Sequence, residues 1–226
     1  MKSCVLAVDT STDACSVALL HDGNVYSSHE LMPREHTLNI LPMVEALLAE
    51  NGVAVSQIEG FIVGAGPGSF TGLRIAFGVV QGLAFACNKP VAVISTLSAL
   101  AYQAVQLSEL KEGSVLTTID ARMKELYWSR FEVRNGSVRI LEGPFVSSAQ
   151  SIDVADVSVV IGTGLVYKEE MKALKKDTLL YPEERPSAEA MIQYASLHTD
   201  VVWQSADQVE PVYVRNNVAK KKLDQK

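Results

Sequence analysis

The 226-residue sequence has few cysteines, no excess of positive charge and no long apolar run. Its three cysteines, Cys4, Cys15 and Cys87, show no metal-ligand spacing, which favours a reducing cytoplasm over a disulfide framework. No apolar run reaches the roughly 18 residues of a membrane helix, and Asp9 and Asp13 interrupt the apolar start, so we expect neither a membrane span nor a signal peptide. The net charge of −6 argues against broad binding of nucleic acid through its phosphates.

Glycine is concentrated in one segment, because seven of the 14 glycines lie between positions 60 and 82. Residues 61–64 predict the end of a buried strand, and the glycine-rich turn 66–72 separates it from a predicted helix over 73–87. A strand, a glycine loop and a helix N-terminus gather backbone N–H groups at one point, which suits an anion. A tight turn that only lets the helix pack on a sheet explains the same glycines equally well.

The polar residues of this loop are candidates under both interpretations. Ser69 and Thr71 can cap the helix or donate to an oxygen, and Arg74 places a positive charge in a first helical turn, which is unfavourable by about 0.3–1 kcal/mol. We therefore expect Arg74 to have a partner, either a bound anion or a nearby acid. The loop matches neither the Walker motif, nor the dinucleotide fingerprint, nor the nucleophile elbow. Its candidate anion-facing residues are Gly66, Gly68, Ser69 and Arg74.

The order of predicted elements occurs twice along the chain. Asp9 and Asp120 each end a strand, and each is followed by a polar turn, a strand, a tight turn ending in glycine and another strand. This repeat predicts an α/β protein of two similar lobes, residues 1–111 and 112–226, in which the last segment is free to pack back on the first lobe. The expected strands are 4–8, 14–20, 25–31, 61–64, 90–95, 115–119, 126–134, 137–141 and 157–161. The expected helices are 37–50, 73–87, 97–110, 166–176 and one that starts at 186–188 and runs to 197, followed by an extended segment over 211–215.

Two predicted helices carry more apolar surface than a single core needs. Helix 37–50, which we expect to be capped near Thr37, and helix 73–87 have apolar residues on more than one face. In the second helix, small residues recur every four positions and form a flat stripe that another helix can approach. Other parts of the same chain could cover these faces, but we favour a partner interface. Its candidate residues are Leu38, Leu41, Glu45, Leu48, Arg74, Phe77, Gly78, Gln81, Gly82, Leu83 and Phe85.

Five motifs are spread over nearly the whole chain: Asp9-Thr-Ser-Thr12, Arg34-Glu-His36, Gly64-Ala-Gly-Pro-Gly-Ser-Phe-Thr-Gly-Leu-Arg74, Asp120-Ala-Arg122 and Pro211-Val-Tyr-Val-Arg215. Together they resemble the TsaB family, also called YeaZ, and the glycine-rich motif is highly specific. The resemblance implies the actin/Hsp70/sugar-kinase-like (ASKHA) fold, with a mixed five-stranded sheet and flanking helices in each lobe. It also implies a role in making N6-threonylcarbamoyladenosine at position 37 of tRNAs that read codons beginning with A. In that pathway the family resembles a non-catalytic partner of the related TsaD subunit, which the ATPase TsaE joins.

The resemblance also indicates which residues would face a nucleotide. In the ASKHA fold the first turn faces Mg²⁺ and phosphate, and the turn of the second lobe closes from the other side. Ala121-Arg122 stands where a glycine would let the backbone approach phosphate, so we expect a degenerate cleft that binds no nucleotide tightly by itself. ATP or ADP with Mg²⁺ is an expectation only for the complex. The residues implied are Asp9, Thr10, Ser11 and Thr12 in the first turn, and Asp120 and Arg122 in the second.

Catalytic relatives hold a metal with two histidines four residues apart on a helix, where this chain has Thr96 and Leu100 in an approximate alignment. We therefore expect no metal site and no catalytic residue, and we expect His36 to dock the following helix. The resemblance and the apolar helices predict a cytoplasmic scaffold that binds TsaD through helices 37–50 and 73–87. We expect it to meet tRNA only through the complex and to form a two-fold homodimer when alone.

Two alternatives stay open. The first is an ATP-dependent phosphotransferase in which Asp9 and Asp120 hold Mg²⁺. The second is a peptidase, a more remote possibility suggested by the old glycoprotease label of relatives. The basic tail over 220–222 is interpreted as a solvated end.

Overall fold

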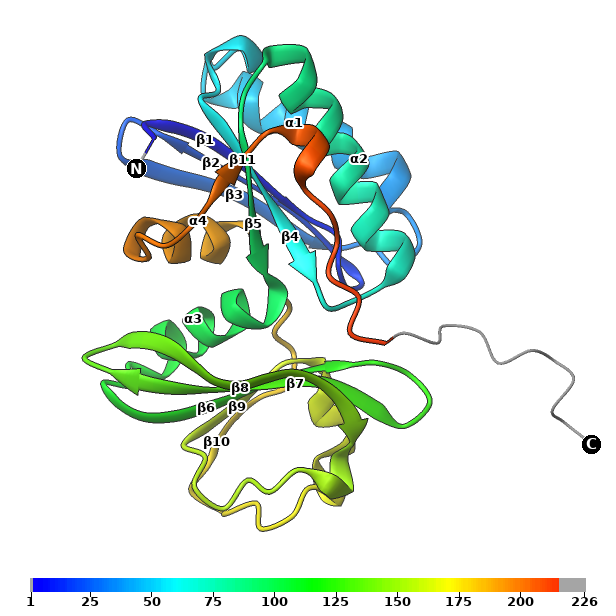
Figure 1. Cartoon of the computed structure of the whole chain (residues 1–226), viewed down its shortest axis with the longest axis vertical. Coiled ribbons are helices and arrows are strands. Elements are labelled where there is room, and N and C mark those ends of the chain that lie inside the picture. The colour runs from blue at the N-terminus through cyan, green and yellow to red at the C-terminus, as the bar shows by residue number, and fades with distance from the viewer. Residues whose placement is uncertain (1, 216–226) are drawn as a thin grey trace, which may run out of the picture.

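The computed structural model describes residues 2–215 and shows two lobes, each built around one sheet (Figure 1). The strands are β1 (Cys4–Asp9), β2 (Ala14–His21), β3 (Asn24–Leu31), β4 (Gly60–Gly66), β5 (Val91–Ser95), β6 (Glu112–Asp120), β7 (Glu125–Arg134), β8 (Ser137–Ser148), β9 (Val159–Ile161), β10 (Leu179–Tyr181) and β11 (Trp203–Gln204). The helices are α1 (His36–Glu50), α2 (Phe70–Cys87), α3 (Thr96–Ser108) and α4 (Ala188–Leu197). Short 3-10 helices cover Val55–Gln57, Ala149–Ser151, Thr163–Glu170 and Ala206–Gln208.

The two sheets have the same topology. The first has the order β11-β5-β4-β1-β2-β3 and the second the order β10-β9-β6-β7-β8. In the first sheet β1 is antiparallel to β2 and parallel to β4, and in the second sheet β6 is antiparallel to β7 and parallel to β9. The predicted two-lobed α/β fold of ASKHA type is thus confirmed. The first sheet has six strands where five were expected, because β11 adds two residues at its edge.

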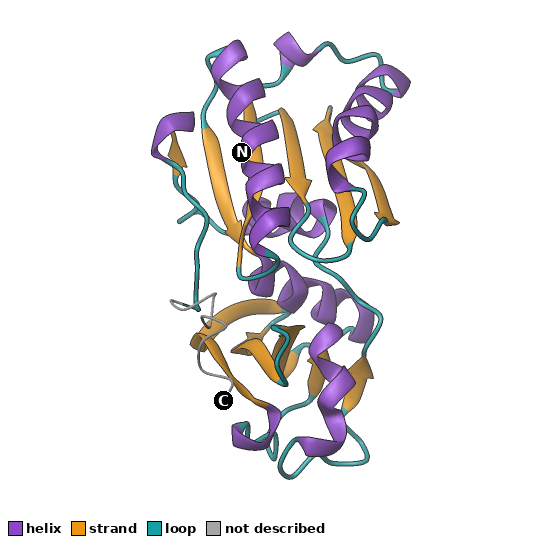
Figure 2. Cartoon of the chain, turned by 90° about the vertical axis from the view of Figure 1, so that its right-hand side faces the viewer, coloured by secondary structure: helices purple, strands orange, loops and turns teal. Residues whose placement is uncertain are grey.

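The layers follow from which sheet faces are apolar. Strands β1 and β4 are buried along their whole length, as expected of strands covered on both faces. Helices α1 and α2 cover one face of the first sheet, and Figure 2 shows helices in front of that sheet. Helix α4 packs on the other face, α3 lies between α4 and the second sheet, and the segment 149–171 covers the outer face of the second sheet.

The chain returns to the first lobe after β10. Helix α4 buries Ala188, Met191 and Ile192 against strands of the first sheet, and its backbone at Ala188 donates to Ser16 Oγ at 2.9 Å. The segment after β11 then runs along α2, where the Gln81 amide donates to the carbonyl oxygens of Ala206 and Val209. The first lobe is therefore built from both halves of the sequence.

Two details of the helices differ from the sequence prediction. The helix expected over 166–176 is wrong: a 3-10 helix ends at Glu170, and Lys172 pairs with the segment around Asp153 instead of continuing it. The expected cap near Thr37 is also wrong, because α1 begins at His36 after an N-cap Glu35 without a side-chain hydrogen bond. The His36 ring lies 2.8 Å from the Thr12 carbonyl oxygen and docks the helix start on the β1–β2 turn, as expected.

Helix α2 is long and apolar enough to pass as a membrane helix, although the sequence analysis expected no apolar run of that length. It is 18 residues long with a mean hydropathy of 1.5, so by length and composition alone it could cross a membrane. In the folded chain it packs on the first sheet through one stripe, which includes Leu73, Ala76, Phe77 and Val80. Only 33% of its residues are fully buried; Ile75, Val79, Leu83 and Cys87 are half-buried against the same core, and the remaining face, which includes Gly78, Gly82 and Phe85, is exposed.

Candidate functional site

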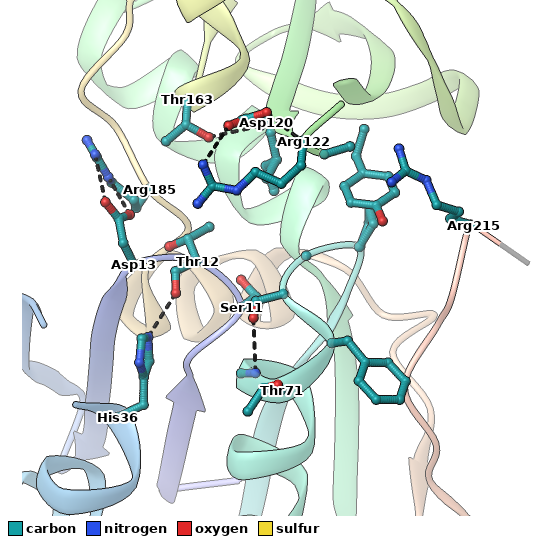
Figure 3. A pocket seen from close by; sticks show the side chains of 18 of the residues that line it. Ser11, Thr12, Asp13, His36, Thr71, Asp120, Arg122, Thr163, Arg185 and Arg215 are labelled. Atoms are coloured by element: carbon teal, nitrogen blue, oxygen red, sulfur yellow. Dashed lines mark hydrogen bonds and ion pairs between the residues drawn. The ribbon is translucent and has the colours of Figure 1, made fainter. Parts of the chain in front are cut away.

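A cavity of about 890 Å³ lies between the two lobes. Its walls come from the β1–β2 turn, the glycine loop with the start of α2, the β6–β7 turn and the segment 212–215, as Figure 3 shows for several of these residues. Turns that follow Asp9 and Asp120 thus meet across the cavity, as the repeat in the sequence implies. Of the candidate nucleotide-facing residues, the cavity is lined by Ser11, Thr12, Gly68, Ser69, Asp120 and Arg122.

The glycine loop is packed tightly against the β1–β2 turn. A side chain at Gly68 would lie 2.4 Å from the carbonyl oxygen of Ser11, and one at Gly72 would lie 1.9 Å from that of Thr10. The Ser69 backbone donates to the Ser11 carbonyl at 2.7 Å, and its hydroxyl accepts from the Gly72 backbone and caps α2. Close packing of backbone on backbone therefore explains these glycines without a ligand.

Asp9 and Thr10 lie in the core and do not line the cavity. One carboxylate oxygen of Asp9 accepts from the backbone and hydroxyl of Ser11 at 3.0 and 2.8 Å. Its other oxygen has no partner among the described residues and faces Gly64, where an added Cβ would lie 1.8 Å away. Burial raises the pKa of Asp9 to about 6. The Thr10 hydroxyl donates to the Gly72 carbonyl at 2.7 Å and holds the β1–β2 turn on the start of α2, whereas the hydrogen bonds of Asp9 stay within its own turn.

The Mg²⁺ site that the phosphotransferase alternative requires does not fit these residues. Asp9 turns its unpartnered oxygen away from the cavity, toward Gly64. Across the cavity, Asp120 accepts hydrogen bonds from the backbone and guanidinium of Arg122 at 2.8 and 3.2 Å. A divalent cation needs several free oxygen ligands at one point, and these two carboxylates do not provide them. Among residues 2–215, no group of three or more His, Cys, Asp or Glu side chains could hold a metal ion.

Two further arginines that the sequence analysis did not single out bind acids at the cavity. Arg185 donates to both carboxylate oxygens of Asp13 at 3.0 and 3.1 Å, and this lowers the pKa of Asp13. Arg215 forms an ion pair with Glu125 at the start of β7. The Asp13 pair joins two segments distant in sequence, so nothing local in the sequence indicated it. Arg215 belongs to the motif Pro211-Val-Tyr-Val-Arg215, one of the five that resemble the TsaB family. That motif was the sequence signal that could have pointed to it.

Arg74 and Gly66 lie beside the cavity and do not line it. Among the described residues no acid pairs with Arg74, so the expected acid partner is wrong, whereas the anion partner stays a prediction. Its guanidinium lies 4.0 Å from the ring centroid of Phe70, and its Nε is 3.4 Å from the Tyr213 hydroxyl. The attraction between a guanidinium and an aromatic face accounts for a positive charge in the first turn of α2.

The candidate interface residues on α1 and α2 fall into three groups. Leu38, Leu41, Glu45, Arg74, Gly78, Gly82 and Phe85 are exposed, and Leu38 and Phe85 reach 76% and 84% exposure. In the described part of the chain no atom comes within 4 Å of a Cβ added at Gly78 or Gly82, so the stripe of small residues is open there. Gln81 and Leu83 are half-buried. Leu48 and Phe77 must be removed from the set, because both are buried in the core of their own lobe.

Thr96 and Leu100, at the positions that resemble the metal-binding histidines of catalytic relatives, have structural contacts. The Thr96 hydroxyl donates to the Pro67 carbonyl at 2.7 Å and holds the glycine loop on α3. Leu100 is fully buried in the core between α3 and the second sheet. The Ser69 hydroxyl oxygen caps α2.

The repeated sheets and the cavity between them define the protein as a two-lobed α/β protein of ASKHA type. The solved structure of YeaZ from Pseudomonas aeruginosa superposes with a TM-score of 0.84 at 41% identity, covering 94% of this chain and 100% of that chain. A second structure, described as an uncharacterized protein with similarity to peptidase YEAZ from the same organism, gives 0.85 at 40% identity, covering 95% and 100%.

Sequence comparisons define the family. The family model for TsaD, described as tRNA N6-adenosine threonylcarbamoyltransferase, matches residues 25–220. The tRNA threonylcarbamoyladenosine biosynthesis protein TsaB of Escherichia coli (strain K12) is 38% identical over 233 residues, which cover 97% of each chain. Its counterpart in Haemophilus influenzae is 39% identical and covers 97% of this chain and 96% of the relative. The chain belongs to the TsaB family.

Proposed function

We propose that this chain is a non-catalytic scaffold in the complex that makes N6-threonylcarbamoyladenosine at position 37 of tRNA. The observation that carries the proposal is the open apolar face of α1 and α2. Only 33% of the residues of α2 are fully buried, and among residues 2–215 no atom lies within 4 Å of a Cβ added at Gly78 or Gly82. An exposed apolar surface of this kind is typical of a protein interface.

On this proposal the face docks on TsaD, and TsaE joins the pair. Two helices offer much of the roughly 1,600 Å² that a specific interface buries in total. In the absence of TsaD, the same face pairs with a second copy as a two-fold homodimer. The protein works in the cytoplasm, and the complex as a whole brings it to tRNA.

The geometry of the cavity supports a role without catalysis. Asp9, the residue that a phosphotransferase would use on Mg²⁺, is buried beside Gly64, and Asp120 is engaged with Arg122. We therefore propose that ATP or ADP with Mg²⁺ is held only in the assembled complex, with groups that the partners supply. The phosphotransferase alternative predicts tight Mg-ATP binding and turnover by this chain alone, which calorimetry and a product assay measure.

Gly78→Arg is the decisive variant for the scaffold. It puts a long charged side chain on the open stripe, and arginine favours a helix over glycine by roughly 1 kcal/mol, so folding is retained. Leu83→Asp is less clean, because Leu83 also packs on the core. The matched control is Gln106→Arg, which adds the same charge at an exposed position of α3.

The test is co-purification with TsaD and TsaE, followed by a tRNA modification assay that omits each protein in turn. We expect Gly78→Arg to lose both the homodimer and the TsaD complex, and with them tRNA modification, while its circular dichroism stays at wild type. Gln106→Arg should behave as wild type in every assay. A Gly78→Arg protein that still binds TsaD at micromolar concentration removes α2 from the interface, and tRNA modification by this chain alone ends the scaffold proposal.

A further inference from the structure

The C-terminal strap, Pro211–Arg215, is not explained by the α1–α2 interface. It leaves the first lobe and runs beside the cavity between the lobes (Figure 1). The Val212 backbone donates to the Ala65 carbonyl at 2.7 Å, and the Tyr213 ring lies 5.3 Å from that of Phe70. At the other end Arg215 pairs with Glu125 on β7 of the second lobe. The strap is thus attached to both lobes and forms one wall of the cavity.

The charge of the cavity is opposite to that of the chain. Its lining has four arginines, Arg34, Arg122, Arg185 and Arg215, against two acids, so the difference is +2 in a protein with a net charge of −6. Both lining acids are paired with arginines, as Figure 3 shows for Asp13 with Arg185 and for Asp120 with Arg122, and Arg215 is paired with Glu125, so three of the four arginines are already in ion pairs. Among the described residues Arg34 has no ion-pair partner. Arg34 is therefore the charge of the described lining that is free to attract an anionic occupant. The net charge of −6 describes the whole surface, whereas an anion at the cavity responds to this local excess of positive charge.

The rim also carries aromatic rings paired with arginines. Phe70 and Tyr213 are both exposed at the rim, and the Arg74 guanidinium lies 4.0 Å from the Phe70 centroid. On the second lobe the Arg215 guanidinium lies 6.0 Å from the Tyr127 centroid. Aromatic faces and guanidinium planes interleaved along a positive groove are the combination that stacks unpaired bases and binds the phosphates between them.

We propose that the cavity rim and the strap bind a single-stranded segment of RNA within the tRNA-modifying complex. Arg34 and Arg122 contact phosphates, and Phe70 and Tyr213 stack on a base. The choice of RNA over DNA rests on the proposed function, whereas the charge and the aromatic rings rest on the structure alone. A turn of three successive residues with positive φ, Arg122 at 65°, Met123 at 56° and Lys124 at 62°, places Arg122 in the cavity lining despite its backbone cost.

The experiment measures binding of a fluorescently labelled anticodon stem–loop RNA to the full chain by anisotropy, at low and at physiological salt. The variants are Arg34→Glu, Arg122→Glu and Tyr213→Ala. The matched control is Arg139→Glu on β8, which makes the same charge reversal away from the cavity. The side chains of Arg122 and Arg139 are exposed to 85% and 72%, and each pairs with an acid, so the two reversals disturb the fold equally little.

We expect each cavity reversal to weaken binding at least about fivefold. The log–log salt dependence should also become shallower by about 0.7 for each phosphate that the variant no longer neutralises. Tyr213→Ala should weaken binding about fivefold or more without changing that slope, because stacking carries no charge. Arg139→Glu should stay within about twofold of wild type, since a distant surface charge is largely screened at physiological salt.

Equal effects of Arg122→Glu and Arg139→Glu would overturn the proposal, because binding would then follow net charge alone. Tight binding of ATP or tripolyphosphate without binding of RNA would assign the cavity to a small phosphorylated ligand and would also overturn it. The Gly78→Arg variant separates this proposal from the scaffold: it should lose TsaD and keep RNA binding. The cavity variants should lose RNA binding and keep TsaD.

Discussion

The buried carboxyl of Asp9 provides a quantitative test of the structure. Burial raises its pKa from an ordinary 3.8 to about 6, and hydrogen bonds from Ser11 offset only part of the cost of burying the charge. At 1.36 kcal/mol per pH unit, that difference corresponds to about 3 kcal/mol of lost stability once the carboxyl is ionised. This is a large share of the roughly 5–15 kcal/mol that stabilises a typical domain.

The direction in which pH changes the free energy of unfolding follows from which state, folded or unfolded, binds the proton of Asp9 more tightly. In the unfolded chain Asp9 ionises near pH 3.8, and in the folded protein it ionises only near pH 6. Between these values the folded state holds the additional proton, so the free energy of unfolding falls as the pH rises through this window and stays lower above it. Asp13 has the opposite effect: Arg185 lowers its pKa, so its contribution is present above its ordinary range and is lost as the pH falls.

The assay is urea unfolding of the wild type and of Asp9→Asn from about pH 4 to about pH 8. Contributions from all other groups cancel in the difference between the two proteins. Relative to wild type, Asp9→Asn should gain up to about 3 kcal/mol between the two ends of this range. Asp13→Asn serves as the control and should become less stable than wild type toward neutral pH, because it loses the pair with Arg185. A difference between Asp9→Asn and wild type that is flat across the range would refute a buried, proton-binding Asp9.

Three further predictions follow from buried or bridging contacts. Gly64→Ala should destabilise the protein by roughly 3 kcal/mol or more in thermal or urea unfolding, because its Cβ would lie 1.8 Å from Asp9 Oδ2 in a close-packed core; a wild-type melting curve would contradict this packing. Cys87 should react quickly with a thiol reagent, whereas Cys15 should react only on unfolding, since it is fully buried and burial raises its pKa to about 11; equal rates for both would be inconsistent with the structure. Arg215→Ala should speed proteolytic cleavage near the strap while changing the global free energy of unfolding by about 1 kcal/mol or less, since it removes one ion pair; unchanged cleavage would show that the pair does not hold the strap.

The sequence by itself determined the strands, the repeat and the family. Apolar runs such as Cys4–Asp9 and the tight turns after β2 and β7 are local signals, so the strands around both aspartates were predicted within a few residues, except that β8 continues to Ser148 where its end was expected at 141. The Ser69 cap, the glycine loop and the excess apolar surface of α2 were also visible as local signals in the sequence. The helix expected over 166–176 failed because a distant pairing of Lys172 with the Asp153 segment overrode a weak local preference.

Only the tertiary structure decided which of the conspicuous residues face the cavity. Sequence places Asp9 at the end of a strand, but its surroundings come from β4 and α4, so its burial beside Gly64 and Met191 could not be read from its neighbours in the chain. The same holds for Phe77, which lies on an exposed-looking helix and is buried by the first sheet, and for Arg74, whose partners are rings rather than an acid. The positive cavity is the clearest case, because its arginines come from positions 34, 122, 185 and 215 and meet only when the two lobes are folded together. Composition sums charge over the whole chain, whereas binding depends on the charge gathered at one point in space.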